Sequence, residues 1–225
     1  MKAATGAWLA GVGMAGAPAL AQTAGGDPPA AGAEPASVPV DAPATKAWEL
    51  SLAVTLYSVP DDRDYVQPTF AADHDWLHLE ARYNYEDADT GSLWAGYNFS
   101  GGKEFTWQVT PMLGGVFGNT TGVAPGYEVT LNWWKLELCS EGEYVVDLGD
   151  ESESFFYSWT ELSVYPVEWF RVGLVGQRTR LYESGRDFEP GVLAGVSFEN
   201  VDVTAYVVGV DDERPTLQVT VGVSF

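Results

Sequence analysis

The most constraining feature of this chain is a two-residue alternation of apolar and polar side chains that recurs from residue 47 to the C-terminus. Residues 77–85 read LHLEARYNY, and the last ten residues read TLQVTVGVSF. Because successive side chains of a β-strand point to opposite faces, each segment predicts a strand with one apolar and one polar or small face. Helical periodicity is nearly absent. The pattern therefore predicts an all-β, antiparallel fold.

The way the connections alternate sets the expected number of strands. If residues 65–70 form a short strand, despite Pro68, which cannot donate to a ladder, the total is about twelve, with ten or eight as alternatives. One end of the fold then holds the connections 71–74, 100–103, 134–135, 166–168 and 199–200. The other end holds 58–64, 87–91, 117–125, 149–153, 183–190 and 211–215, which are generally longer. An even strand number with short turns at one end and longer loops at the other is typical of a transmembrane β-barrel.

The first 46 residues differ from the rest of the chain. Residues 1–21 combine a basic start, a short apolar run and the small-residue motif Ala19-Leu20-Ala21, which predicts a cleaved secretory signal peptide. The apolar run is shorter than the roughly 20 residues that a membrane-spanning helix needs. Residues 22–46 are rich in Ala and Pro and have too little apolar area to offset the entropy of ordering, so we expect a disordered periplasmic tail. Residues 47–225 are expected to form the barrel.

The C-terminal strand, residues 216–225, is closed by the aromatic Phe225 and resembles the last strand of bacterial outer-membrane β-barrels. Segments Leu77–Asp87 and Gly91–Phe99 also look like strands of small, uncharacterised, porin-like barrels of Gram-negative bacteria. The resemblance covers the signal peptide and residues 48–225. It implies an outer-membrane location, contact with lipid and lipopolysaccharide, and delivery by the barrel-assembly machinery, which reads the terminal aromatic in that family. We expect a monomer with both ends of the barrel domain at the periplasmic rim.

Charged residues on the polar parity are expected to face the lumen, because a base in the middle of a lipid face costs about 2–4 kcal/mol. Their excess of carboxylates over bases favours cations over anions. We therefore predict a narrow, cation-preferring pore for small solutes or ions. The alternative is an internal network that fills the barrel, because twelve strands fall between small filled barrels and large open ones. The candidate lumen-lining residues are Glu49, His78, Glu80, Arg82, Asn84, Trp94, Glu104, Gln108, Glu128, Asn132, Glu137, Glu141, Glu143, Trp159, Glu161, Arg171 and Gln177.

The chain is strongly acidic, with a formal net charge of −21 at pH 7. Acids also dominate the longer predicted connections, as in Asp211-Asp212-Glu213. This charge argues against nucleic acid, which is bound through Lys and Arg. Carboxylates can bind divalent cations, but no dedicated metal-binding loop is recognisable, so we predict no metal site and no cofactor. The alternative function is a non-transporting envelope or adhesion barrel that acts through its acidic external loops.

Residues with catalytic potential are scarce. The two histidines, His74 and His78, are not accompanied by a nucleophile motif such as Gly-x-Ser-x-Gly, so we predict no enzymatic activity. Cys139 is the single cysteine, which excludes an intramolecular disulfide, and it is expected to fill space in the lumen. A further alternative is a secreted, soluble, ligand-binding barrel, which would turn its apolar face inward.

Overall fold

The computed structural model describes residues 47–60, 63–149, 154–181 and 187–225, so the predicted signal peptide and tail lie outside the described residues. No helix in the described part is long and apolar enough to cross a membrane. The strands are β1 (Glu49–Ser58), β2 (Tyr65–His74), β3 (Leu77–Tyr83), β4 (Thr90–Tyr97), β5 (Phe99–Gly102), β6 (Phe105–Gly118), β7 (Gly122–Trp133), β8 (Leu136–Asp147), β9 (Phe155–Val167), β10 (Phe170–Leu181), β11 (Asp187–Phe198), β12 (Val201–Val208) and β13 (Thr216–Ser224).

Strands β4 and β5 together occupy one strand position in the barrel wall, and we call each such position a stave. Both pair with β6 in a single continuous register, which runs from Thr90 opposite Gly118 to Gly102 opposite Thr106. Only Asn98 separates the two segments. The thirteen assigned strands therefore make twelve staves, which confirms the predicted strand number.

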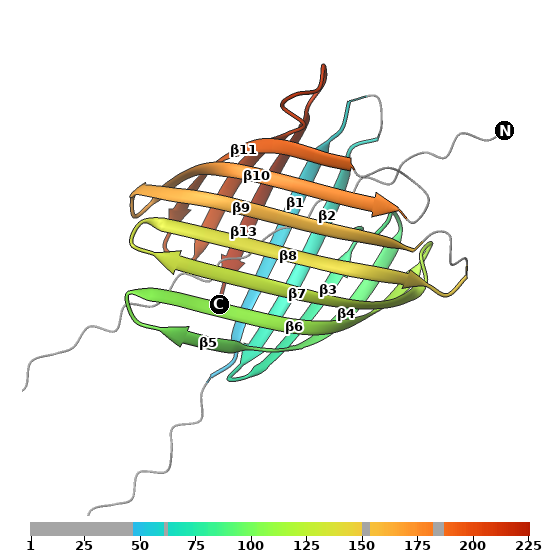
Figure 1. Cartoon of the computed structure of the whole chain (residues 1–225), viewed down its shortest axis with the longest axis horizontal. Helices are drawn as coiled ribbons and strands as arrows, with labels where there is room; N and C mark the ends of the chain where they lie inside the picture. The colour runs from blue at the N-terminus through green and yellow to red at the C-terminus, as the bar shows by residue number, and fades with distance from the viewer. Residues whose placement is uncertain (1–46, 61–62, 150–153, 182–186) are drawn as a thin grey trace, which may run out of the picture.

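The sheet closes on itself. Every strand pairs antiparallel with its neighbours, and β1 pairs with β13 from Ser51 opposite Ser224 to Ser58 opposite Leu217. Figure 1 shows the blue β1 beside the red β13, with the remaining strands running around the barrel between them. Closure gives each stave hydrogen-bonded neighbours on both sides, which is the condition for a sheet to be stable in lipid; among the described strands, the short segment β5 pairs with β6 alone.

The two ends of the barrel have different connections. One end has only two-residue turns, at 75–76, 103–104, 134–135, 168–169 and 199–200, and we call it the short-turn end. The described connections at the other end, the loop end, are 59–64, 84–89, 119–121, 148–154 and 209–215, of which residues 61–62 and 150–153 lie outside the description. The connection between β10 and β11, and with it part of the predicted acidic loop 183–190, also lies outside the described residues.

Several predicted boundaries were wrong by a few residues. Strand β2 continues to His74, so residues 71–74 are not a turn, and the turn is at 75–76. Strand β6 extends to Gly118 and β7 begins at Gly122, which shortens the predicted 117–125 loop to three residues. Both errors have one cause: β-strands extend as far as a partner strand continues the ladder, and a single sequence does not show where its partner ends.

The outward face is apolar along the full length of the strands. Leu93, Leu113 and Leu174 each expose more than 60% of their surface, and many other large apolar residues are also exposed. A patch of this extent on a protein surface marks contact with lipid or with another apolar surface. Aromatic residues lie near the ends of the strands, among them Tyr97, Phe99, Phe105 and Trp133, as in the girdles of transmembrane barrels.

Candidate functional site

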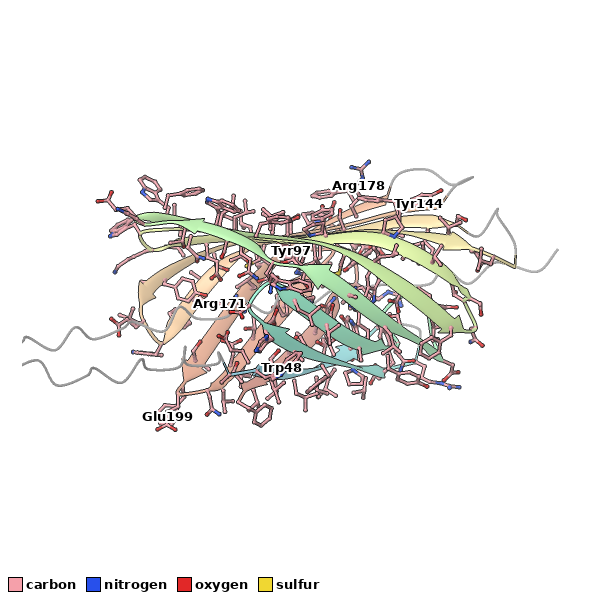
Figure 2. The ribbon with its side chains drawn as sticks, turned by 90° about the horizontal axis from the view of Figure 1, so that it is seen from below. Trp48, Tyr97, Tyr144, Arg171, Arg178 and Glu199 are labelled. Atoms are coloured by element: carbon pink, nitrogen blue, oxygen red, sulfur yellow. The ribbon has the colours of Figure 1, made fainter. Side chains whose placement is uncertain are left out.

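The lumen holds the charged residues that could act on a solute. The residues that alternate with the apolar ones in β3, β8, β9 and β10 point inward, and they are buried. Of the predicted lining residues, those buried are His78, Glu80, Arg82, Trp94, Glu137, Glu141, Glu143, Trp159, Glu161, Arg171 and Gln177. Cys139 is also buried among them. Figure 2 shows Arg171 between the two walls of the barrel, while Tyr144 and Arg178 lie on its outside.

Arg82 is the centre of one cluster. Its guanidinium donates to Glu80 Oε2 at 2.7 Å and to Glu143 Oε2 at 3.1 Å. Glu128 Oε1 lies 3.9 Å from the same group. The guanidinium carbon lies 4.1 Å from the centre of the Tyr85 ring and 4.7 Å from that of Trp94. A planar guanidinium can pair with carboxylates at its edge and stack on rings at its faces, so Arg82 offsets the charge of several buried acids at once.

Arg171 is the centre of a second cluster, at the register irregularity between β9 and β10. It donates to Thr204 Oγ1 at 2.8 Å and to Glu161 Oε2 at 3.4 Å. Asp202 and Glu137 lie 3.6 and 3.8 Å from the guanidinium. Two aromatic donors complete the cluster: Trp159 Nε1 donates to Glu161, and the Tyr165 hydroxyl donates to Glu137, both at 2.8 Å.

An aromatic layer fills the lumen towards the loop end. Tyr57, Tyr85, Tyr157, Trp159 and Tyr206 each expose 2% of their surface or less, and they belong to one hydrophobic cluster with inward residues of most strands. Tyr85 packs edge-on against Tyr157, and Trp159 does the same against Tyr206. The Tyr85 hydroxyl donates to Glu141 at 2.8 Å, which links this layer to the acids. The inside of the barrel is therefore closed by side chains at this level.

The short-turn end is more open. Glu128 and Asn132 of β7 are partly exposed, and Gln108 of β6 is exposed. The side chains of Asp73 and Asp202 are about one third exposed, at 32% and 38%. We call these five residues the vestibule. Water reaches the lumen from this end, and the groups that it meets are acids and amides.

Three predicted lining residues lie at the rim or in a connection instead of along the lumen wall. Glu49 at the start of β1 and Glu104 in the 103–104 turn are exposed at the rim. Asn84 follows the end of β3, where its side chain donates to the Val66 carbonyl and accepts from the Asp89 amide. Its φ of 56° is left-handed, so the strand alternation no longer applies there. Asn84 therefore caps a connection and does not line a pore.

Sequence reasoning missed three partners of the clusters. Asp73 fell in a predicted turn because β2 was expected to end at residue 70, yet it accepts from His78 and Asn98. Thr204 and Tyr165 are neutral and carry no charge pattern, although Thr204 accepts a hydrogen bond from Arg171 and Tyr165 donates one to Glu137. The inward parity of β12 would have identified Thr204, since Asp202, Thr204 and Tyr206 share one face.

Glu86 lies in the 84–89 connection, outside the strands, and is fully buried. Burial raises the pKa of its carboxyl, and the charge of nearby Arg82 acts in the opposite direction. Burial in the folded barrel therefore favours the neutral form of the Glu86 carboxyl over the ionised form.

Comparison with known proteins identifies solved structures with a similar fold. No protein-family model and no curated protein matches the sequence. Among solved structures, the barrel is similar to a KdgM porin in complex with disordered oligogalacturonate, with a TM-score of 0.55, 10% identity, and coverage of 79% of this chain and 99% of that chain. A second KdgM porin structure matches with a TM-score of 0.55, 11% identity, and coverage of 78% and 99%. The expected porin-like barrel fold is thereby confirmed.

Proposed function

We propose that this protein is an outer-membrane β-barrel with a cation-preferring passage, and that its aromatic layer holds the passage shut in the conformation described. The observation that carries the proposal is the charge inside the barrel. The buried acids are Glu80, Glu86, Glu137, Glu141, Glu143, Asp147 and Glu161, and the buried arginines are Arg82 and Arg171. Burial favours the neutral form of Glu86, so six acids stand against two arginines, and with the further acids in the vestibule cations are favoured over anions.

The outward apolar belt supports the membrane location. Exposed Leu, Val, Phe and Trp side chains cover the outside of the staves, as a surface in contact with lipid and lipopolysaccharide requires. In the orientation we propose, the short turns and Phe225 face the periplasm, and the loop end with its acids faces outward. A soluble ligand-binding barrel would need a polar exterior instead. Fractionation of outer membranes and heat-modifiable migration in detergent gels test this location.

The acidic lumen also bears on the class of solute. One of the KdgM porin structures was solved in complex with oligogalacturonate, a polymer of uronic acids. The carboxylate excess here would repel a polyanion at close range. We therefore assign a small cation or a neutral solute to the passage.

Single-channel recording in a planar bilayer tests the passage. Tyr157→Ala removes a ring of the aromatic layer, so we expect rare or small current steps in the wild type and larger, cation-preferring steps in this variant. Tyr144→Ala is the matched control, because Tyr144 faces outward from β8. Anion preference, or no steps in folded wild type and folded Tyr157→Ala alike, would defeat the passage.

The filled lumen favours a second candidate, a non-transporting envelope or adhesion barrel. The hydrophobic cluster links inward residues of strands all around the barrel, which suits a solid scaffold. The exposed 211–215 segment, with Asp211, Asp212 and Glu213, would then carry the function. Loss of whole-cell binding to a surface on neutralising these three acids, together with a silent Tyr157→Ala barrel, would support this candidate over the passage.

A further inference from the structure

Three potential metal ligands meet in the lumen near the vestibule. His78 and Glu80 share the inward face of β3, and Glu128 comes from β7. One ligand atom from each residue lies within 4.8 Å of the others. Zn²⁺ binds both histidine nitrogen and carboxylate oxygen, and a site with three protein ligands leaves a fourth position for water.

The barrel brings these residues together across two intervening staves. His78 pairs with Gly96 of β4, Gly96 with Met112 of β6, and Met112 with Gly126 of β7. Gly96 and Gly126 add no side chain to the inward face between β3 and β7, and inward neighbours pack directly over them. A Cβ on Gly96 would lie 2.9 Å from Thr110 Cγ2, and one on Gly126 would lie 2.9 Å from the Trp94 ring, so a side chain at either position would collide with a neighbour.

The orientation of His78 is the observation that points to a ligand. Its Nδ1 lies 2.9 Å from Asp73 Oδ1, which also accepts from Asn98 Nδ2 at 2.6 Å. An ionised carboxylate only accepts, so Nδ1 carries the proton and, in the neutral ring, Nε2 has a free lone pair. His78 is 4% exposed, and its Nε2 is buried without a hydrogen-bond partner, 3.9 Å from Glu80 Oε2. A carboxylate that fixes a histidine in this way is the usual second shell of a metal-bound imidazole.

We propose that His78 Nε2, Glu80 and Glu128 bind a divalent transition-metal ion, with Zn²⁺ preferred. The local composition supports a divalent ion, because the carboxyl groups of Asp73, Glu80 and Glu128 surround His78 and only one guanidinium, that of Arg82, lies beside them. The imidazole ligand selects against Mg²⁺ and Ca²⁺, which take oxygen ligands. Arg82 donates to Glu80 Oε2 at 2.7 Å, so this carboxylate would be shared between the guanidinium and the ion. The partly exposed Glu128 and Asp73 give the ion a path from the short-turn end.

Isothermal titration with ZnCl₂ tests the site on the full exported chain, folded in detergent and without a polyhistidine tag. We expect one saturable site in the wild type. His78→Gln and Glu128→Gln each remove a ligand, so each should weaken binding by about 100-fold or more, since loss of a second-shell partner alone costs about 10–100-fold. Asp73→Asn should fall in that second-shell range. Co²⁺ absorption gives an independent readout, because removal of the nitrogen ligand in His78→Gln shifts the visible bands.

Two control variants distinguish the loss of a metal ligand from a general effect of mutation. His74→Gln changes the other histidine, and Glu137→Gln changes a buried glutamate of the Arg171 cluster, so both should keep the wild-type affinity within about twofold, in line with sites that do not interact. Heat-modifiable migration shows that each variant is folded. Should His78→Gln misfold, Glu128→Gln, at the partly exposed edge, decides alone. Zn²⁺ binding that folded Glu128→Gln retains, or no binding by the wild type, overturns the proposal and leaves His78 as an imidazolium between Asp73 and Glu80.

Discussion

Arg82 Nη1 and Glu143 Oε2 lie 3.1 Å apart and join β3 to β8, two strands that share no hydrogen-bonded ladder. The contact spans 61 positions of sequence. Both side chains are nearly inaccessible to water. The pair therefore links two separated parts of the wall through the lumen, and its energy depends on the burial of both partners.

Removal of the Arg82 charge is expected to destabilise the barrel strongly. Arg82→Met keeps the length of the side chain but leaves Glu80 and Glu143 buried and unpaired, which costs about 3–5 kcal/mol. Urea unfolding in detergent measures this loss. Arg178→Met is the control, because Arg178 contacts the outward Phe156 ring and the change should cost no more than about 1 kcal/mol. An Arg82→Met barrel as stable as the wild type would show that the acids of this cluster are neutral.

Two adjacent glycines of β6 are expected to respond oppositely to alanine. A Cβ at the inward Gly114 would lie 2.5 Å from the Trp94 ring, whereas the outward Gly115 has nothing within 4 Å. Gly114→Ala should therefore cost about 1–3 kcal/mol through overpacking. Gly115→Ala should stabilise by about 0.5–1 kcal/mol, because alanine restricts the unfolded chain. Equal effects in unfolding titrations would mean that Trp94 moves aside freely.

Glu86 is expected to make stability fall as pH rises. Its pKa is raised in the folded barrel, while in the unfolded chain it is near the ordinary value of about 4.3. The unfavourable contribution is therefore absent below the unfolded pKa, grows as pH rises through the folded pKa, and persists above it. Glu86→Gln should raise the urea midpoint at neutral pH and lose this advantage in acid. An unchanged urea midpoint at neutral pH in folded Glu86→Gln would contradict this expectation.

Two glutamates at the first position of two-residue turns provide a matched pair. Glu199 has a left-handed φ of 53°, whereas Glu168 is not among the left-handed residues of the described chain. A left-handed backbone costs an ordinary residue about 1–2 kcal/mol, and glycine avoids this cost. Glu199→Gly should therefore be neutral or stabilising in unfolding titrations, and Glu168→Gly should destabilise. The reverse order would indicate that the Glu199 side chain itself stabilises its turn.

Most of the fold could be predicted from local patterns. A period of two places Glu80, Arg82, Glu143 and Arg171 on one face of their strands, and a face with such charges is unfavourable in lipid. Strand ends were less predictable, because the end of a ladder depends on its partner. Asn84 and Asp73 show both kinds of error, since one lies beyond the end of its strand and the other lies inside a strand that was expected to stop earlier.

The sequence by itself determined the closed antiparallel barrel, its twelve staves and the division between apolar and polar faces, because each follows from alternation and from connections that are local in the chain. Only the tertiary structure decided which inward residues meet. Arg82 reaches Glu143, and Glu128 approaches His78, because closure of the barrel sets the stagger between distant staves. Alternation predicts that a side chain faces the lumen, whereas packing across the lumen determines which residues that side chain contacts.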